Sequence, residues 1–220
     1  MTKGLFITFE GGEGTGKSTQ IKLLSEVLEK SGITTVCTKE PGGTPIGLEI
    51  RKLLVTGDKD KFDETTEALL YYADRRINLT QKVWPAMEEG AWVLSDRFAD
   101  STVAYQYYGY NKRIDLQTLN YLYTITAGDF KPDLTIILDI DPKIGLARSL
   151  KKAEGMSVKE TRHESRAFEF HTRLREGYLE IAKKEPNRCV VLNADTSIEN
   201  LHKEILQTIE ERFKVKLCRK

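Results

Sequence analysis

The glycine-rich segment Gly11–Ser18 constrains this chain more than any other stretch of its sequence. It follows the apolar run Leu5–Phe9 and precedes an amphipathic stretch that begins at Thr19. The segment fits the pattern G-x-x-x-x-G-K-[ST], whose glycines let backbone N–H groups turn inward around a polyphosphate. A dinucleotide-binding loop fits less well, because G-x-G-x-x-G would need Lys17 to be its last glycine. A strand, this loop and a helix in that order predict a phosphate-binding loop.

Two side chains at the end of the loop have defined chemistry in this pattern. Lys17 is predicted to reach the β- and γ-phosphates as a point charge, and Ser18 to offer its hydroxyl to Mg²⁺. The helix that begins there adds the positive end of its dipole. The predicted polyphosphate-binding residues are Gly11, Gly12, Glu13, Gly14, Thr15, Gly16, Lys17, Ser18 and Thr19.

Composition limits the possible partners. The chain has 220 residues, enough for one α/β domain over residues 1–220 with a substantial core. Its 34 basic and 33 acidic residues nearly cancel, so the charge argues for no nucleic acid or membrane partner. Cys37, Cys189 and Cys218 lack C-x-x-C spacing, which is typical of reduced thiols. With no leader or transmembrane run, we expect a cytoplasmic protein.

Short apolar runs alternate with helical periodicity along the chain. The predicted strands are Leu5–Phe9, Ile33–Thr38, Trp92–Ser95, Leu134–Leu138 and Cys189–Leu192. Helical spacing is clearest over 19–32, 64–79, 116–128, 164–185 and from Ile198 onward. This alternation predicts an α/β fold with a buried parallel sheet covered on both faces. The basic stretch 142–166, with a polar centre at Gly155–Ser157, is predicted to be a mobile flap and not a packed element.

Acidic residues follow several of the predicted strands. Ligands of open parallel sheets gather at the carboxyl ends of strands, where the sequence places Glu10, Glu40, Asp96-Arg97 and Asp139. Mg²⁺ bound to a nucleotide needs a nearby carboxylate, commonly through water. Asp96 is the first candidate and Asp139 the second. A helix cap or a loop salt bridge is an equally good interpretation of Asp139.

Helical spacing places two pairs of residues together. Tyr71 and Arg75 share a helix face, which suits a flat heterocycle with carbonyl oxygens, although a core tyrosine beside a surface arginine explains the pattern as well. Ser101 and Tyr105 share a face in the same way. The three histidines, at positions 163, 171 and 202, lack metal-ligand spacing and are interpreted as structural or surface residues.

These stretches together resemble thymidylate kinases of the bacterial type over nearly the whole chain. The resemblance lies in residues 9–19, 38–44, 68–75 and 96–106. It implies a P-loop nucleoside monophosphate kinase fold, with a five-stranded parallel sheet flanked by helices, a flexible lid at about 148–163, and a homodimer. It also implies transfer of the γ-phosphoryl of ATP, bound with Mg²⁺ at Ser18 and Asp96, to dTMP, giving ADP and dTDP.

The resemblance also implies roles for residues around the acceptor nucleotide. Glu13 would contact the sugar 3′-hydroxyl, and Arg51 and Arg97 would hold the acceptor phosphate. Tyr105 would crowd the sugar 2′ position and so favour deoxyribose.

Further residues would contact the base or lie along the acceptor. Tyr71 would stack on thymine and Arg75 would bond a thymine carbonyl. Ser101, Thr102 and Gln106 would lie along the acceptor. Most relatives carry Phe at the position of Tyr71, so its hydroxyl needs a partner or solvent.

Gly14 stands where eukaryotic relatives place an arginine, and such enzymes draw the missing cation from the lid. Arg162 best matches the lid arginine, which makes Lys17, Arg97 and Arg162 the predicted catalytic residues. Further lid candidates are Arg148, Lys151, Lys152 and Lys159.

Two other functions fit parts of the sequence. A kinase of another small acceptor, such as a deoxynucleoside, would use the same fold, but Arg51 and Arg97 favour an acceptor that carries a phosphate. A guanine-nucleotide switch would need Asn-Lys-x-Asp after a strand, whereas Asn111–Asp115 is one residue too long and follows no predicted strand.

Overall fold

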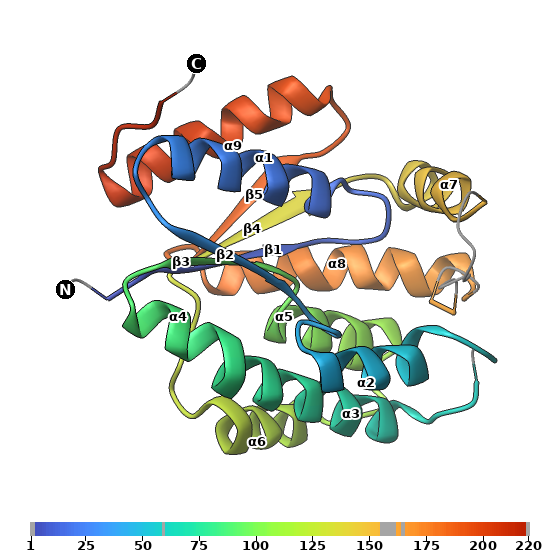
Figure 1. Ribbon diagram of the computed structural model, residues 1–220. Helices are drawn as coiled ribbons and strands as arrows, with labels where there is room; N and C mark the ends of the chain where they lie inside the picture. The colour runs from blue at the N-terminus through green and yellow to red at the C-terminus, as the bar shows by residue number, and fades with distance from the viewer. Residues whose placement is uncertain (1–2, 59, 155–161, 164–165, 219–220) are drawn as a thin grey trace.

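The computed structural model describes all residues except 1–2, 59, 155–161, 164–165 and 219–220. Its centre is a parallel sheet of five strands in the order β2-β3-β1-β4-β5 (Figure 1), which confirms the predicted architecture. The strands are β1 Phe6–Glu10, β2 Thr35–Lys39, β3 Trp92–Asp96, β4 Leu134–Asp139 and β5 Cys189–Asn193. Each strand overlaps the apolar run that predicted it.

Helices cover both faces of the sheet. Helices α1 (Lys17–Lys30) and α9 (Ile198–Phe213) pack on one face, the upper one in Figure 1. The other face carries α2 Pro45–Val55, α3 Glu64–Asn78, η1 Leu79–Val83, α4 Trp84–Glu88, α5 Ala99–Thr102, η2 Val103–Gly109, α6 Leu116–Ala127 and α8 Phe168–Lys184. Among the described residues, no helix is long and apolar enough to span a membrane.

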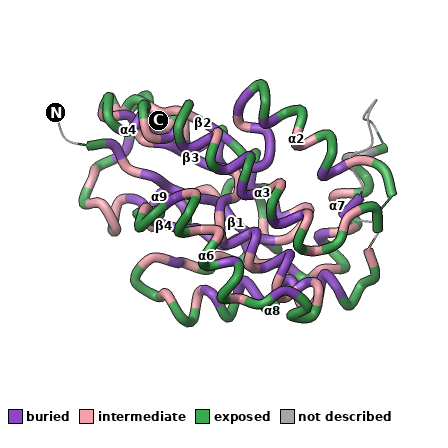
Figure 2. Tube along the Cα trace, turned by 90° about the horizontal axis from the view of Figure 1, so that it is seen from below, coloured by how far each residue is buried: buried purple, intermediate pink, exposed green. Residues whose placement is uncertain are grey.

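The central strand β1 decides which residues reach the site. All five of its residues are buried, as expected for a parallel strand with helices on both sides, and buried residues concentrate in the middle of the molecule (Figure 2). Alternate side chains of a strand point to opposite faces. Ile7 and Phe9 join the core under α1 and α9, whereas Phe6 joins the core under α4. Glu10 therefore faces the same side as Phe6, where α5 and α8 lie.

The prediction that residues 142–166 are not a packed element is wrong over the first half of this stretch. Residues Pro142–Ala153 form helix α7, which begins with Asp141 accepting a hydrogen bond from the Lys143 backbone N–H at 2.8 Å. An acidic N-cap followed by proline at the first helical position is a strong start signal, which outweighs the basic composition. The lid candidate Lys159 lies outside the described residues, as does the polar centre at Gly155–Ser157. The following helix α8 begins at Phe168, four residues later than the spacing predicted.

The segment after β3 is not a regular α-helix. Helix α5 continues directly into η2, a π-helical segment that carries Tyr105 and Gln106. π-Helical turns are uncommon and occur frequently at functional sites. Ser101 on α5 nevertheless donates to Glu10 of β1, and Tyr105 on η2 donates to Glu13 of the phosphate loop.

Candidate active site

The phosphate-binding loop has the backbone conformation that its glycines predict. Gly11, Gly14 and Gly16 have φ angles of 132°, 67° and 91°, which L side chains rarely adopt. The Lys17 ammonium lies inside the loop and donates to the carbonyls of Gly11 at 3.1 Å and Gly12 at 2.9 Å. Burial lowers the pKa of Lys17 to about 8, and the nearby guanidinium of Arg97 adds to this shift. A phosphate in the loop would offer this buried ammonium a stronger partner than two carbonyls.

Helix α7 explains why position 14 is glycine. A Cβ built on Gly14 would lie 2.0 Å from the carbonyl oxygen of Gly145 on α7. Conversely, a Cβ on Gly145 would lie 2.4 Å from the carbonyl oxygen of Glu13. The loop and α7 therefore pack backbone against backbone, and an arginine at position 14 does not fit this arrangement.

Ser18 and Asp96 lie together at the carboxyl ends of β1 and β3. The Ser18 hydroxyl donates to Asp96 Oδ2 at 2.7 Å. A hydroxyl beside a carboxylate is an oxygen donor set that suits Mg²⁺. Asp139 instead accepts two hydrogen bonds from Arg175, at 2.7 and 2.8 Å, so the salt-bridge interpretation of Asp139 is confirmed. Within the described part of the chain, no group of three or more His, Cys, Asp or Glu residues could hold a metal ion.

Arg97 connects the phosphate loop with the region beneath β1. It has a φ of 74° and lies 15 % exposed. Its guanidinium donates to the Gly11 carbonyl at 3.0 Å and to Glu13 at 3.2 Å. Burial raises the pKa of Glu13, but Arg97 and Lys17 outweigh this and hold the pKa at about 2; the Tyr105 hydroxyl also donates to this carboxylate. The arrangement keeps Glu13 ionised beside two cations.

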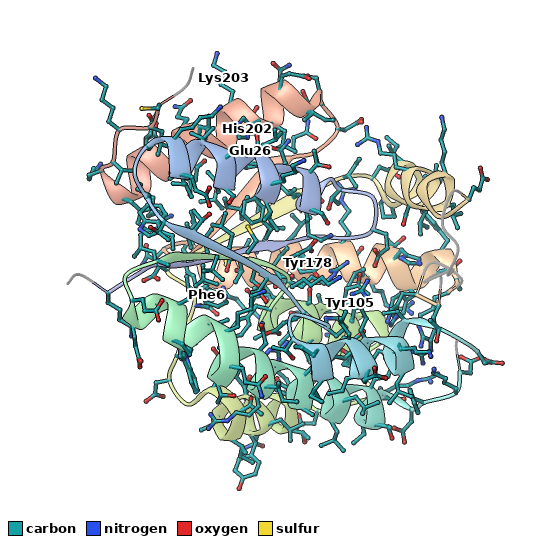
Figure 3. All side chains as sticks on the ribbon, viewed as in Figure 1. Phe6, Glu26, Tyr105, Tyr178, His202 and Lys203 are labelled. Atoms are coloured by element: carbon teal, nitrogen blue, oxygen red, sulfur yellow. The ribbon has the colours of Figure 1, made fainter. Side chains whose placement is uncertain are left out.

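Glu10 and Tyr178 form a buried hydrogen-bond network next to Arg97. Glu10 accepts from the Phe98 backbone N–H at 2.7 Å, the Ser101 hydroxyl at 2.5 Å and the Tyr178 hydroxyl at 3.2 Å. Burial and the charge of a neighbouring aspartate raise the pKa of Glu10 to about 7. Tyr178, from α8, also accepts a hydrogen bond from Arg97 at 3.1 Å, and lies with Tyr105 on the same side of the sheet (Figure 3). No sequence pattern singles out Tyr178, because it occupies an ordinary apolar position of a helix.

Arg75 is buried and not a surface arginine. Only 1 % of its side chain is exposed, and it donates to Glu40 at 2.8 Å and to Thr102 at 2.9 Å. The guanidinium also lies over the rings of Tyr72 and Phe98, at 4.8 and 5.0 Å. Its remaining nitrogen, Nη1, has no hydrogen-bond partner among the described residues. A buried N–H without a partner is costly, and an acceptor on a ligand would satisfy it.

The hydroxyl of Tyr71 has a partner that sequence reasoning missed. It is hydrogen-bonded to His163 Nε2 at 2.9 Å, and the His163 ring also meets the edge of the Tyr105 ring at 5.3 Å. Burial lowers the pKa of His163 to about 3, so the imidazole is neutral at physiological pH. The interpretation of His163 as merely structural is incomplete, because it also lines the cleft described below. A lone histidine in a polar segment carries no sequence signal for this position.

The arginines of the predicted flap occupy different places. Arg162 is buried and donates to Glu67 of α3 and to the Leu54 carbonyl at 3.0 Å. Arg148, on α7, donates to the Ala194 carbonyl and to Asp195, both at 3.1 Å, and lines the cleft next to the phosphate loop. The structure therefore brings Arg148, and not Arg162, to the loop.

One cleft of about 500 Å³ contains most of these groups. Its lining includes Lys17, Ser18 and Asp96 of the phosphate-loop region, Arg75 and Tyr71 of α3, and Arg97. The other predicted site residues that line it are Glu13, Gly14, Thr15, Gly16, Thr19, Arg51, Ser101, Thr102, Tyr105 and Gln106. Arg51 donates to the Pro41 carbonyl at 3.0 Å. Gly11 and Gly12 line a smaller cavity behind the loop.

A phosphate-binding loop at the end of β1 of a five-stranded parallel sheet, in a cleft that Arg75, Tyr71 and Gln106 also line, defines a P-loop fold of the nucleoside monophosphate kinase class. The thymidylate kinase family model matches residues 9–205. The chain is 45% identical over 211 residues to thymidylate kinase of Magnetococcus marinus, covering 96% of this chain and 98% of the relative. It is 46% identical over 212 residues to that of Maridesulfovibrio salexigens, covering 96% and 97%. This protein belongs to the thymidylate kinase family.

A solved structure supports the same assignment. The crystal structure of thymidylate kinase from Ehrlichia chaffeensis aligns with a TM-score of 0.75 at 34% identity. The alignment covers 94% of this chain and 99% of that one. The resemblance inferred from the sequence motifs is thus confirmed over nearly the full length of both chains.

Proposed function

We propose that this protein transfers the γ-phosphoryl group of ATP to the 5′-phosphate of dTMP, producing ADP and dTDP for dTTP synthesis. The observation that carries the proposal is the single cleft that joins the phosphate loop to the pocket around Arg75 and Tyr71. Membership of the thymidylate kinase family supports the same reaction. Arg97 lines this cleft and contacts the loop, where it can bridge donor and acceptor phosphates.

The chemistry required of the protein is alignment and charge neutralisation. The phosphate of the acceptor is already an anion, so the reaction needs no strong general base. Lys17 would leave the carbonyls of its own loop and bind the donor phosphates, while Arg97 and Arg51 would hold the acceptor phosphate. Because all three side chains line one cleft, their positive charge can offset the repulsion between the two anions.

Ser18 and Asp96 would hold Mg²⁺ in this cleft. Their adjacent oxygens fit a cation that prefers hydroxyl, carboxylate and water ligands. When bound with ATP, the ion neutralises charge on the β- and γ-phosphates.

The second pocket would select the acceptor. Tyr71 supplies an aromatic surface on which thymine can stack, and Arg75 offers a buried N–H to a base carbonyl. Glu13 would accept a hydrogen bond from the sugar 3′-hydroxyl. Tyr105, fixed by its bond to Glu13, would stand beside the 2′ carbon and disfavour ribose.

The cation that compensates for Gly14 is proposed to come from Arg162, in line with the family resemblance. To reach the phosphates, Arg162 has to leave its buried ion pair with Glu67. Arg148 already lines the cleft and is the competing candidate. Comparing Arg162→Ala with Arg148→Ala at saturating ATP and dTMP distinguishes the two candidates. The variant that lacks the cation should have a kcat about 10³-fold below that of the wild type. A loss below threefold in Arg162→Ala would refute its assignment.

We also propose a homodimer and a cytoplasmic location, both expected from the resemblance and the sequence. Large apolar side chains are exposed on α2, α3 and α6, which form one side of the molecule. They include Leu48, Leu53, Leu69, Tyr121 and Ile125. Such a surface suits a second copy of the chain. Sedimentation velocity tests this proposal, and a monomer at micromolar concentration would contradict it.

A panel of acceptors tests the proposed reaction. ADP release is measured with ATP, Mg²⁺ and each of dTMP, dCMP, dGMP and thymidine. We expect kcat/KM to be highest for dTMP. If dTMP were no better than the other monophosphates or than thymidine, the proposed function would fail, and a kinase of another small acceptor would replace it.

A further inference from the structure

The side-chain amide of Gln106 is held by one end only. Its Nε2 group donates to Glu67 Oε2 at 3.0 Å, whereas its Oε1 atom is buried and has no partner among the described residues. Both side chains are completely buried. A buried carbonyl oxygen without a donor is unfavourable, which points to a donor on a bound ligand.

Glu67 determines which end of the Gln106 amide faces it and which end faces the cleft. Its carboxylate also contacts the guanidinium groups of Arg162 and Arg166, and the Tyr110 hydroxyl donates to it at 2.8 Å. A carboxylate in such surroundings only accepts hydrogen bonds, so the NH₂ end of Gln106 has to face it. The oxygen end is therefore the one that remains for the cleft, which Gln106 lines.

The free end of Gln106 and the free end of Arg75 form a pattern. Gln106 Oε1 is an acceptor and Arg75 Nη1 is a donor. Both atoms are buried and have no hydrogen-bond partner within the described part of the chain, and both residues line the cleft with Tyr71. A ring N–H beside a carbonyl, as in thymine or uracil, complements this pair. Cytosine presents the opposite pattern, a ring nitrogen acceptor beside an NH₂ donor, and would leave like groups facing each other.

We propose that Glu67 is a specificity-determining positioning residue, which orients the Gln106 amide so that the site accepts a thymine-type base and rejects cytosine. Glu67 acts through Gln106 and touches neither substrate. The inference rests on the proposed function, because it assumes a nucleotide acceptor in this cleft.

The test is the ratio of kcat/KM for dTMP to that for dCMP in Glu67→Gln. The new amide can donate to Gln106, which lets Gln106 turn its NH₂ end toward the cleft. We expect the ratio to fall by at least about tenfold. Because the ratio compares two acceptors on one enzyme, any loss of turnover caused by releasing Arg162 cancels.

Tyr110→Phe is the matched control. It removes a buried hydrogen bond to Glu67 Oε1 but leaves the Oε2 contact to Gln106, so the ratio should stay within twofold of the wild type. In a Gln106→Leu background, Glu67→Gln should have no further effect on the ratio, since Glu67 acts through the amide. A merely structural role of Glu67 would leave the ratio unchanged in Glu67→Gln itself, whereas the proposed role requires the ratio to fall when Gln106 is present and not when it is absent.

Glu67→Asp covers the case in which Glu67→Gln fails to fold. It keeps the negative charge for both arginines but withdraws the carboxylate from Gln106, so the ratio should fall at least threefold. A ratio within twofold of the wild type in a folded Glu67 variant would overturn the inference. A wild-type enzyme that does not prefer dTMP would instead refute the proposed function, so the two failures are distinguishable.

Discussion

Glu40→Gln breaks the buried ion pair between Glu40 and Arg75, and we expect it to lower the stability of the protein by an amount that can be worked out from the structure. The two side chains are 3 % and 1 % exposed, so the charge that remains on Arg75 after the substitution is not screened by water. Glu40 accepts from two donors, Arg75 Nε at 2.8 Å and Asn78 Nδ2 at 3.1 Å. A glutamine has only one acceptor oxygen, and one of these donors will therefore face an NH₂ group.

Breaking a buried pair costs about 3–5 kcal/mol. Arg75 keeps its bond to Thr102 and its contacts with two aromatic rings, so we expect a value near the lower end, about 3 kcal/mol. For a chain of this size that corresponds to a fall in Tm of roughly 6–12 °C. Differential scanning calorimetry measures it, and the KM for dTMP should rise in the same variant because Arg75 is no longer held.

Asp195→Asn is the matched control for Glu40→Gln. It deletes one charge of the Arg148–Asp195 pair, whose side chains are 43 % and 51 % exposed. An exposed pair contributes at most about 1 kcal/mol, so Tm should fall by no more than about 4 °C. If both substitutions lowered Tm by the same amount within 2 °C, burial would not be the source of the effect and the reasoning would be refuted.

Three further predictions concern separate parts of the site. Tyr71→Phe keeps the ring but removes the bond to His163, and should lower the free energy of unfolding by about 1 kcal/mol while the KM for dTMP changes less than threefold; an unchanged urea midpoint would contradict this. Gly145→Ala should destabilise the protein by about 1–3 kcal/mol through its contact with Glu13, whereas helix propensity alone predicts a gain of about 1 kcal/mol. The pKa of Lys17 without ligand is about 8, so this amine is largely neutral at pH 8.5 and charged at pH 6.5. Binding of ATP favours the charged form, and Lys17 should therefore take up a proton on binding at pH 8.5 but not at pH 6.5. Calorimetry in buffers of different ionisation enthalpy measures this uptake.

The sequence alone determined the fold class of this protein and the conformation of its glycine-rich loop. Apolar runs, helical spacing and glycines are local signals, and they predicted all five strands and the phosphate loop. Local signals also placed Asp96 next to Ser18, because the carboxyl ends of parallel strands meet at one edge. Over residues 142–153 the two local signals disagree: the basic composition is typical of a flap, but the N-cap at Asp141 begins helix α7.

The tertiary structure decided which polar groups are buried and which atoms of each remain free. Spacing could not show that Arg75 is buried against Glu40, or that Tyr71 bonds His163, since these partners lie 35 and 92 residues apart. Nor could it show that Arg162 pairs with Glu67 while Arg148 lines the cleft. A hydrogen bond between side chains of separate elements forms only when their separation is right to within a few tenths of an ångström, and only packing of the helices on the sheet sets that separation. The phosphate loop follows from the order of residues in the chain, whereas the pocket that would choose the base exists only in the folded protein.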